Sequence, residues 1–304
     1  MTNNSQKIIP HLWFDKEAHD AAKFYTTVFP ESKITNIREL KDTPGGGSEI
    51  LSFQLWRRPF MAISAVPYFQ INPSISFMVN FDSSRLERAA EQLEEVWHRL
   101  AEGGRVLMPL DSYPFSRRYG WVEDKYGLSW QLILTNPEGE ERLEIIPSFL
   151  FTGEVHGKAE EAIDFYVSVF KNAKKGHIAR YPKGMEPDQE GSVMFADFMI
   201  ENQWFAAMDS GRNHDFHFNE AVSFIVNCGT QEEIDYYWKK LSAVPESEQC
   251  GWLKDKFRVS WQIVPAELEE MMAACTAEQA KRLNEAIFKM KKLDLPVLRK
   301  AYEG

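Results

Sequence analysis

Residues Gly120–Ile133 read GWVEDKYGLSWQLI, and residues Gly251–Val264 read GWLKDKFRVSWQIV. Seven of the fourteen aligned positions are identical. Shorter matching blocks precede both segments in the same order: IIPHLWF at Ile8–Phe14 with IIPSFLF at Ile145–Phe151, FYTTVF at Phe24–Phe29 with FYVSVF at Phe165–Phe170, and SFMVN at Ser76–Asn80 with SFIVN at Ser223–Asn227. Matching blocks in a constant order indicate an internal repeat. The chain is therefore predicted to be a tandem duplication.

Each repeat alternates apolar runs with segments that have one apolar face, which predicts strands and amphipathic helices in an α+β fold. The first repeat is predicted to contain strands at 8–14, 33–40, 49–56 and 60–66 around a helix at 17–29, then strands at 74–79, 105–110, 119–123 and 128–134 around a helix at 84–100. The second repeat follows the same plan up to Val264. Each repeat thus reads as two βαβββ units. The predicted boundaries are 1–136 and 143–266 for two domains, with a linker near Asn136–Arg142, and 267–304 for a helical tail.

The tail carries its own helix signals. Pro265 suits the first turn of a helix over Glu267–Ala274. Thr276 and Gln279 form a capping-box pattern that starts a second helix, and Pro296 is predicted to end it. We expect this tail to pack on the body as a structural clasp.

The repeats differ in two places. Asn80 and Trp121 are 41 positions apart, whereas Asn227 and Trp252 are only 25 apart, so the first repeat has 16 extra residues. Such insertions often lie on loops near a binding site. In addition, the second repeat has Arg258 where the first has Gly127. If this turn needs a positive φ, a side chain there costs about 1 kcal/mol, so the second turn is predicted to differ.

Composition narrows the function classes. The chain has 45 acidic and 35 basic residues, a net charge of −10, which disfavours nucleic acid and anionic membrane surfaces as partners. No apolar stretch approaches the roughly 20 residues that cross a bilayer. The cysteines Cys228, Cys250 and Cys275 lack metal-ligand spacing. We expect a cytoplasmic protein that binds neither nucleic acid nor membrane.

The blocks IPHLWF, FYTTVFP, SFMVN and DKYGLSWQL resemble the PhnB-like family, which carries the label 3-demethylubiquinone-9 3-methyltransferase. This family belongs to the vicinal oxygen chelate superfamily of glyoxalases, bleomycin-resistance proteins and extradiol dioxygenases. The resemblance covers residues 8 to about 265 in two copies. It implies tandem glyoxalase-like domains, each built from two paired βαβββ units that form a curved mixed sheet around a cavity. The methyltransferase label lacks motif support, because the glycine cluster Gly45–Gly47 precedes a predicted strand instead of linking a strand to a helix.

The resemblance also implies where a metal would be held in metal-dependent members, on the first and last strands of paired units. His11 falls on the first-strand position and Gln131 on the last-strand position, with Ser74 and Ala62 at the remaining ones. The counterparts in the second repeat are Ser148, Ala221, Gln262 and about Ala207. Since hydroxyl and methyl groups do not anchor a divalent ion, no cofactor is expected. A divalent metal, if bound, would be held weakly by His11 with Gln131 or Gln262.

We therefore expect a small-molecule-binding protein with degenerate metal sites. Candidate residues of the ligand cavity are Trp13, Trp121, Trp130, Gln131, Trp261 and Gln262. The alternative is a metal-dependent glyoxalase- or dioxygenase-like enzyme that uses His11 as a metal ligand or general base. His11 could equally be a hydrogen-bonded core histidine. Because single-domain relatives pair as dimers, the duplication favours a monomer with an internal pseudo-dimer, or a homodimer.

Two other groups invite a functional reading. His214 and His217 are three residues apart in a predicted loop, where a structural or rim role is favoured over zinc binding. Cys250 precedes Gly251, and no base or positive charge is identified to activate its thiol. We expect Cys250 to act as a small buried hydrophobe.

Overall fold

A computed structural model of the chain describes residues 6–43, 46–135 and 140–304. Part of the expected linker, and Gly45 of the glycine cluster, lie outside these residues. The strands form two mixed sheets of seven and eight strands. The chain divides into two compact units. Unit 1 comprises Met1–His11 and Val222–Gly304, and unit 2 comprises Leu12–Ala221.

The first module of the chain has the predicted order of elements. It consists of β1 (Ile8–Phe14), α1 (Ala18–Val28), β2 (Lys33–Thr43), β3 (Gly46–Leu55) and β4 (Arg58–Ser64). Helix α1 buries Ala18, Ala21, Ala22 and Tyr25, which are the residues whose spacing predicted an apolar face. Small alanines on this face let the helix lie close to the strands that it covers.

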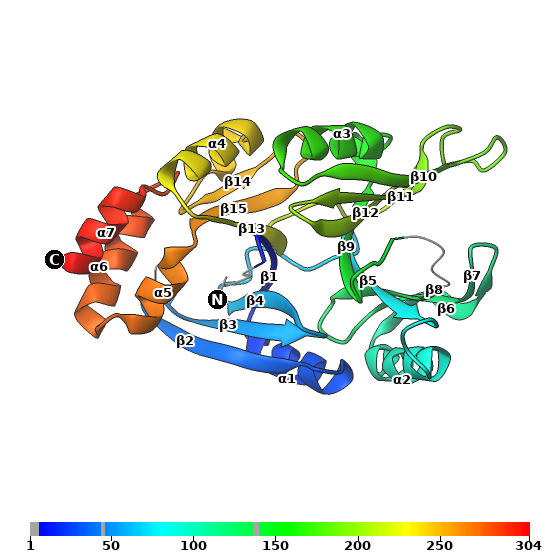
Figure 1. Cartoon of the computed structure of the whole chain (residues 1–304), viewed down its shortest axis with the longest axis horizontal. Coiled ribbons are helices and arrows are strands. Elements are labelled where there is room, and N and C mark those ends of the chain that lie inside the picture. The colour runs from blue at the N-terminus through cyan, green and yellow to red at the C-terminus, as the bar shows by residue number, and fades with distance from the viewer. Residues whose placement is uncertain (1–5, 44–45, 136–139) are drawn as a thin grey trace. The chain divides into compact units, whose positions relative to one another are not determined.

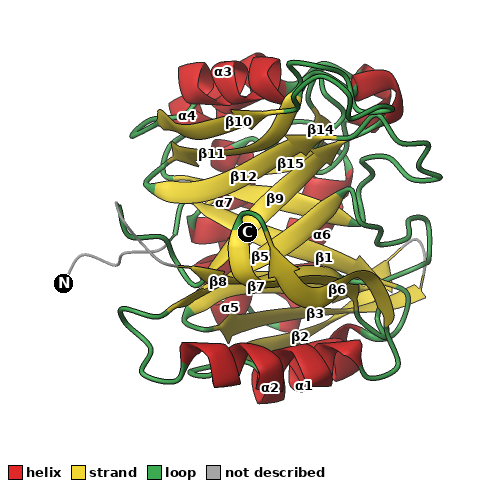
Figure 2. Cartoon of the chain, turned by 90° about the vertical axis from the view of Figure 1, so that its right-hand side faces the viewer, coloured by secondary structure: helices red, strands yellow, loops and turns green. Residues whose placement is uncertain are grey.

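The eight-stranded sheet lies entirely in unit 2, in the order β10-β11-β12-β9-β5-β8-β7-β6. Its elements are β5 (Ile75–Asp82), α2 (Ala89–Ala101), β6 (Arg105–Tyr113), β7 (Ser116–Glu123), β8 (Ser129–Thr135), β9 (Ile145–Phe151), α3 (Ala159–Val169), β10 (Lys174–Arg180), β11 (Val193–Ile200) and β12 (Gln203–Asp209). The central strands β5 and β9 are antiparallel, and each also pairs in parallel with the last strand of its own module. Figure 2 shows α3 along the strands β10–β12. Half of this sheet therefore comes from each sequence repeat.

Unit 1 contains β13 (Val222–Cys228), α4 (Gln231–Leu241), β14 (Trp252–Lys254) and β15 (Ser260–Pro265), followed by the tail helices α5 (Glu267–Ala274), α6 (Ala277–Phe288) and α7 (Leu295–Glu303). The start of β1 joins this unit, because Asn227 N donates to Lys7 O at 2.9 Å. In unit 2, a module from one repeat thus pairs with a module from the other through β5 and β9, and in unit 1 the start of β1 pairs with β13 of the second repeat. The domain boundaries at 1–136 and 143–266 stay a prediction.

The tail differs from the prediction at two proline residues. Pro265 is the last residue of β15 and does not lie in the first turn of α5, whose N-cap is Ala266. Thr276 and Gln279 do form a capping box at the start of α6. Pro296, however, does not end that helix, which stops at Phe288. It lies in the first turn of a third helix, α7, where its missing N–H costs no hydrogen bond. Figure 1 shows α6 and α7 (orange to red) side by side.

The 16 extra residues of the first repeat do not form a loop at a binding site. They belong largely to β6 and its hairpin with β7, so they complete the edge of a sheet. The second repeat lacks such a strand, and the tail supplies the missing hydrogen bonds. Cys250 N donates to Met290 O at 2.8 Å, and Gly251 N donates to Lys291 O at 2.7 Å. The segment at Met290–Lys291 therefore replaces the lost edge strand.

The shared glycine of the two GW motifs permits close packing at this edge. A Cβ at Gly120 would lie 2.5 Å from the Trp97 ring, and a Cβ at Gly251 would lie 3.2 Å from Leu293 Cδ1. The tail leucine thus packs on unit 1 at the position where α2 packs on unit 2. Gln231 of α4 also binds the tail segment, since its Nε2 donates to Leu293 O at 3.3 Å.

The DKYG and DKFR segments form the same turn around a buried aspartate. Asp124 Oδ1 accepts the backbone N–H groups of Tyr126 and Leu128, and its Oδ2 accepts Trp130 Nε1 at 2.8 Å. Asp255 makes the matching bonds, including one from Trp261 Nε1 at 2.9 Å. Each aspartate therefore ties its turn to a core tryptophan.

The expectation of a different second turn is wrong. Arg258 has a φ of +73°, close to the +84° of Gly127, and Arg258 N donates to Asp255 O as Gly127 N donates to Asp124 O. The three hydrogen bonds to the Asp255 side chain outweigh the cost of a left-handed arginine. The second repeat therefore keeps the same turn, with Arg258 in a strained left-handed conformation.

Arg258→Gly should raise the free energy of unfolding by about 0.5–1 kcal/mol, because glycine adopts a positive φ without a Cβ clash. Urea unfolding of the purified variant measures this change. The matched control is Gly127→Ala, which should lower stability by a similar amount although its Cβ meets nothing closer than 3.8 Å. Loss of stability in Arg258→Gly would contradict this account of the turn.

Leu293→Ala should destabilise unit 1 by about 2–4 kcal/mol, since Leu293 is 1% exposed and its truncation opens a cavity at the sheet edge. Val297, 45% exposed in the same tail, provides the control. Val297→Ala should change stability by less than about 0.5 kcal/mol. Equal effects of the two changes in thermal unfolding would mean that the tail does not clasp the sheet.

Candidate functional site

The alternation of side chains along each last strand separates tryptophan from glutamine. In unit 2, the Trp130 ring lies 5.6 Å from Phe77 and 5.5 Å from Tyr25 of α1, and it is fully buried. Gln131, the next residue, points to the opposite side of the sheet. In unit 1, Trp261 packs on Phe224 at 5.5 Å, which leaves Gln262 on the other side. We call the glutamine side of each sheet its inner face.

This alternation decides the place of two predicted cavity residues. Trp130 and Trp261 are 0% exposed and donate their indole N–H groups to Asp124 and Asp255. They lie in the core, on the side of each sheet away from the glutamines. Only one member of each Trp-Gln pair can face a ligand, and in both repeats it is the glutamine.

The inner face of unit 2 carries a closed polar cluster. Gln131 Nε2 donates to Ser76 Oγ at 2.8 Å and lies 3.5 Å from Ser148 Oγ. Gln131 Oε1 accepts the Tyr119 hydroxyl at 2.7 Å. Burial raises the pKa of Tyr119, so its hydroxyl stays protonated and keeps this bond. The amide of Gln131 is thus occupied at both ends.

Strand register corrects two of the positions that the resemblance implied. Ser148 faces Ser76 of β5 and Ala206 of β12. The inner position on β5 is therefore Ser76 and not Ser74, which precedes the strand. Ala207 pairs with Phe149, a residue of the aromatic core. It therefore points to the opposite side of the sheet, and Ala206 holds the inner position.

These four positions of unit 2 do not fit a divalent cation. Ala206 offers a methyl group, and the serines Ser76 and Ser148 offer neutral hydroxyls. Gln131 would have to ligate through Oε1, which already accepts a hydrogen bond from Tyr119. A neutral donor set bonded to itself does not offset the cost of stripping water from a divalent ion.

Unit 1 carries the matching cluster. Gln262 Nε2 donates to Ser223 Oγ at 3.0 Å. Asn227 N donates to Lys7 O, and Trp13 N donates to Ala221 O at 2.8 Å. This antiparallel register puts His11 opposite Ser223 on the inner face. Ala221 is two residues before Ser223 and lies opposite Trp13. Ser223, and not Ala221, therefore matches the implied site.

His11 differs from its repeat counterpart Ser148 in having no partner for Nδ1, an atom that is shielded from solvent. The ring is 5% exposed and stands edge-on to Trp252, with 5.5 Å between centroids. Burial lowers the pKa of His11 to about 3. The imidazole is therefore neutral at physiological pH, and it presents one unused polar atom.

A second unused polar atom lies on the same inner face. Trp121 Nε1 donates to Ser129 Oγ at 2.6 Å in the first repeat. The matching hydroxyl in the second repeat, that of Ser260, is buried without a partner. Ser260 and Gln262 are two residues apart on β15, so both face inward. Unit 1 thus has two unsatisfied polar atoms where unit 2 has a closed network.

The remaining predicted residues lie elsewhere. Trp13 donates Nε1 to Val66 O at 3.0 Å and packs edge-on against Phe69. His214 Nε2 lies 2.9 Å from Ser210 Oγ, which indicates a structural role in its loop. Burial raises the pKa of the Cys250 thiol, so the thiolate that a nucleophile needs is disfavoured. Among residues 6–43, 46–135 and 140–304, no three histidine, cysteine or acidic side chains gather as a metal site.

The sequence patterns missed Tyr119, Ser76, Ser223 and Ser260 as members of these clusters. Ser76 and Ser223 lie at matched positions in the repeated SFMVN and SFIVN blocks, and Ser260 is the serine of the repeated SWQ motif. That recurrence was an available signal. Tyr119 had none, because its counterpart is Cys250.

The neutral buried state of His11 gives a pH prediction. The unfolded chain binds a proton at His11 near pH 6.5 and the folded chain does not. Stability from this group is therefore fully present above about pH 6.5 and falls at lower pH by about 1.4 kcal/mol per unit. The stability difference between wild type and His11→Leu should shift by about 2 kcal/mol between pH 7.5 and pH 5.

Urea unfolding of both proteins at each pH measures this difference. Subtraction of the variant removes the contributions of other groups, such as Asp124, whose pKa burial raises to about 6. A difference that does not change with pH would show that His11 is hydrated or hydrogen-bonded.

The chain is similar to known proteins in sequence and in fold. A family model described as 3-demethylubiquinone-9 3-methyltransferase matches residues 6–133 and again residues 143–264. The chain is similar to the PhnB protein from Bacillus cereus, with 38% identity over 43% of this chain and 100% of that chain, at a TM-score of 0.38. It is 30% identical to a protein from Staphylococcus aureus over 42% of this chain and 95% of that chain, with a TM-score of 0.17. No curated protein matches.

Glyoxalase I from Zea mays matches over most of both chains, 88% of this chain and 96% of that one, with a TM-score of 0.51 and 12% identity. At this identity the likeness concerns the fold alone. None of the described helices is long and apolar enough to cross a membrane. The family description names a methyl transfer, but it is the name of the family model and identifies no substrate of this chain. Matched twice by that model, the chain belongs to the PhnB-like family and has the vicinal oxygen chelate fold in two tandem copies.

Proposed function

We propose that the chain binds a small apolar or aromatic molecule through the inner face of unit 1, without a metal ion. The observation that carries this proposal is the pair of buried, unpartnered polar atoms, His11 Nδ1 and Ser260 Oγ. A buried polar atom without a partner costs about 1–3 kcal/mol, so native proteins rarely keep one without a use. A bound molecule with a polar group would satisfy both atoms.

The chemistry of the face defines the polar group of the ligand. His11 is neutral because burial holds its pKa near 3, so it can donate or accept one hydrogen bond but supplies no charge. Ser260 likewise donates or accepts. Trp252 adds an aromatic edge beside His11. These groups suit a carbonyl or hydroxyl group on an apolar body.

A metal-free mode of binding is favoured by the donor set. Two of the inner positions of unit 1, Ser223 and Gln262, are bonded to each other through the Gln262 amide N–H. The Gln262 amide therefore presents its N–H group, and not the lone pairs of its oxygen, to Ser223. His11 with one glutamine would give a divalent ion two neutral ligands, which favours weak binding.

The alternative function is an enzyme that uses His11 with Gln262. It is favoured by the same unpartnered Nδ1, which could ligate a metal or accept a proton from a substrate. Gln131 does not serve this alternative, because it belongs to the other sheet and its amide is occupied. Methyl transfer has no residue support in either unit.

We also propose that the protein is a monomer with an internal pseudo-dimer and that it is located in the cytoplasm. Modules from both repeats pair inside unit 2, which supports a monomer with an internal pseudo-dimer over an obligate homodimer. All three cysteines are free thiols, which is consistent with a reducing cytoplasm. Sedimentation of the purified protein measures the oligomeric state.

Elemental analysis of tag-free protein, after separate dialysis against Mn²⁺, Ni²⁺, Fe²⁺ and Zn²⁺, tests the metal-free mode. We expect far less than one ion per chain under every condition. Near-stoichiometric metal that His11→Ala abolishes would overturn the proposal in favour of the enzyme. Metal that His11→Ala retains would also contradict it, because another site would then hold the ion.

Ligand binding is tested in parallel by NMR with acetophenone, which joins a carbonyl group to an aromatic ring. We expect shifts at the His11 ring and the Trp252 indole, and weaker binding in His11→Leu and Ser260→Ala by about three- to tenfold each. Ser129→Ala makes the matched change in the other repeat and should leave binding unaltered. Binding that is equal in all four proteins would reject this face as the site.

A further inference from the structure

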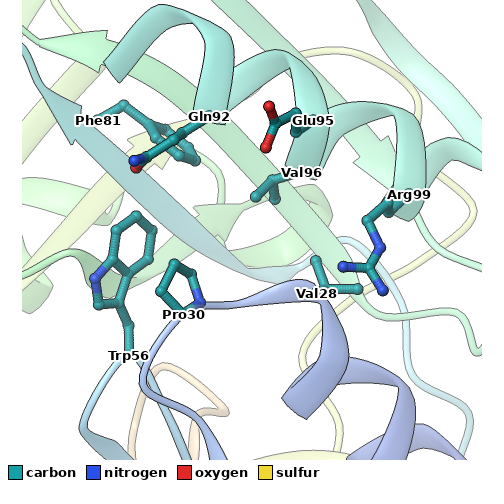
Figure 3. A pocket seen from close by; sticks show the side chains of 8 residues that line it. All are labelled: Val28, Pro30, Trp56, Phe81, Gln92, Glu95, Val96 and Arg99. Carbon is teal, nitrogen blue, oxygen red and sulfur yellow. The ribbon is translucent and has the colours of Figure 1, made fainter. Parts of the chain in front are cut away.

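A pocket lies in unit 2, on the helix side of the sheet, and it is separate from the inner face. It has a volume of about 100 Å³. Its walls are the apolar side chains of Val28, Pro30, Trp56, Phe81 and Val96, with polar Gln92, Glu95 and Arg99. Figure 3 shows the residues of α2 on one side and Pro30, Val28 and Trp56 on the other.

Trp56 forms this pocket at a conformational cost. It occupies the β3–β4 turn with a φ of +48°, followed by Arg57 at +67°. Asparagine or glycine is the usual residue at such a position, and a bulky side chain there is an outlier. Trp56 N is anchored by Ser32 Oγ at 2.9 Å, so the turn holds the indole in place.

The second repeat shows that the left-handed turn does not require a tryptophan. The matched β11–β12 turn has Glu201 at +48° and Asn202 at +59°. Both turns are therefore left-handed, yet only the first presents an indole. Trp56 is 4% exposed, so the strained turn holds a buried indole that packs on the core and also lines the pocket. Here the indole covers Phe81 edge-on, with centroids 5.5 Å apart, and completes an aromatic wall.

Gln92 supplies the polar element of the pocket. Its Oε1 is shielded from solvent and has no hydrogen-bond partner. In Figure 3 the side chain extends from α2 toward Phe81 and Trp56. The unused acceptor therefore lies beside the aromatic wall, where a molecule in the pocket would meet it.

The charged residues of the pocket are engaged with the protein. Arg99 donates to the main-chain oxygen and the hydroxyl of Thr27, and Glu95 pairs with Arg88 at 3.3 Å. The recognition elements that remain are an aromatic wall and one acceptor. A closed cavity of roughly 150 Å³ admits benzene. This pocket, at about 100 Å³, is smaller, so a single ring would fill it and extend into its mouth.

We propose that this pocket is a binding site for a small aromatic molecule with one O–H or N–H donor, its ring against Trp56 and Phe81 and its donor on Gln92 Oε1. The site is independent of the function proposed for unit 1. It gives the chain a second ligand or an effector position that the repeat symmetry does not predict, since Glu201 replaces the tryptophan in the other half.

Phenol and toluene test the proposal, because they differ only in a hydroxyl and a methyl group on the same ring. Titration followed by NMR should shift the Trp56 indole N–H and the methyl groups of Val28 and Val96. Phenol should bind about fivefold more tightly than toluene, as one buried hydrogen bond predicts. In Gln92→Leu this preference should disappear, while toluene still binds.

Trp56→Asn removes the wall but suits the left-handed turn, so the variant should fold and lose phenol binding by about tenfold. Glu201→Asn makes the same change in the other repeat and should bind phenol as the wild type does. Absence of shifts at the pocket residues would overturn the proposal. So would unchanged affinity in Trp56→Asn, or a preference for phenol that persists in Gln92→Leu.

Discussion

The buried carboxylates of Asp124 and Asp255 are the interaction on which the two halves of the molecule depend. Each one accepts two backbone N–H groups of its turn and the indole N–H of a fully buried tryptophan. The turn and the core are thereby tied at one point. Because side chains alternate along a strand, the tryptophan in the core forces the following glutamine to the inner face.

Because of that constraint, a glutamine lies at the same position on both inner faces, but the residues around it differ. The first repeat closes its face, since Tyr119 and Ser76 occupy both ends of the Gln131 amide. In unit 1, Cys250 takes the place of Tyr119, and His11 takes the place of Ser148. The exchange leaves His11 Nδ1 without a partner. Duplication has thus produced one sealed face and one face with unused hydrogen-bonding capacity.

The tail shows how a shortened repeat keeps its sheet. Loss of the β6 equivalent would expose the N–H groups of Cys250 and Gly251, and Met290 and Lys291 accept them instead. Because exposed sheet edges invite pairing with other chains, this cover protects unit 1. The shared glycine of both GW motifs lies where a side chain of an outer element approaches closely, the Trp97 ring at Gly120 and Leu293 at Gly251, and Gly251 in addition adopts a φ of +89° that favours glycine.

The sequence by itself determined the duplication, the βαβββ order of the first three modules and most element bounds, because these depend on local periodicity and on recurring blocks. It also located Gln131 and Gln262. It did not decide which module pairs with which, nor that Ser76 and Ser223, and not Ser74 and Ala221, hold the inner positions. These follow from register between strands that are distant in the chain. Only the tertiary structure showed that Trp130 and Trp261 belong to the core, that Arg258 keeps a glycine turn, and that Trp56 and Gln92 share a pocket, since each results from contacts that no local pattern encodes.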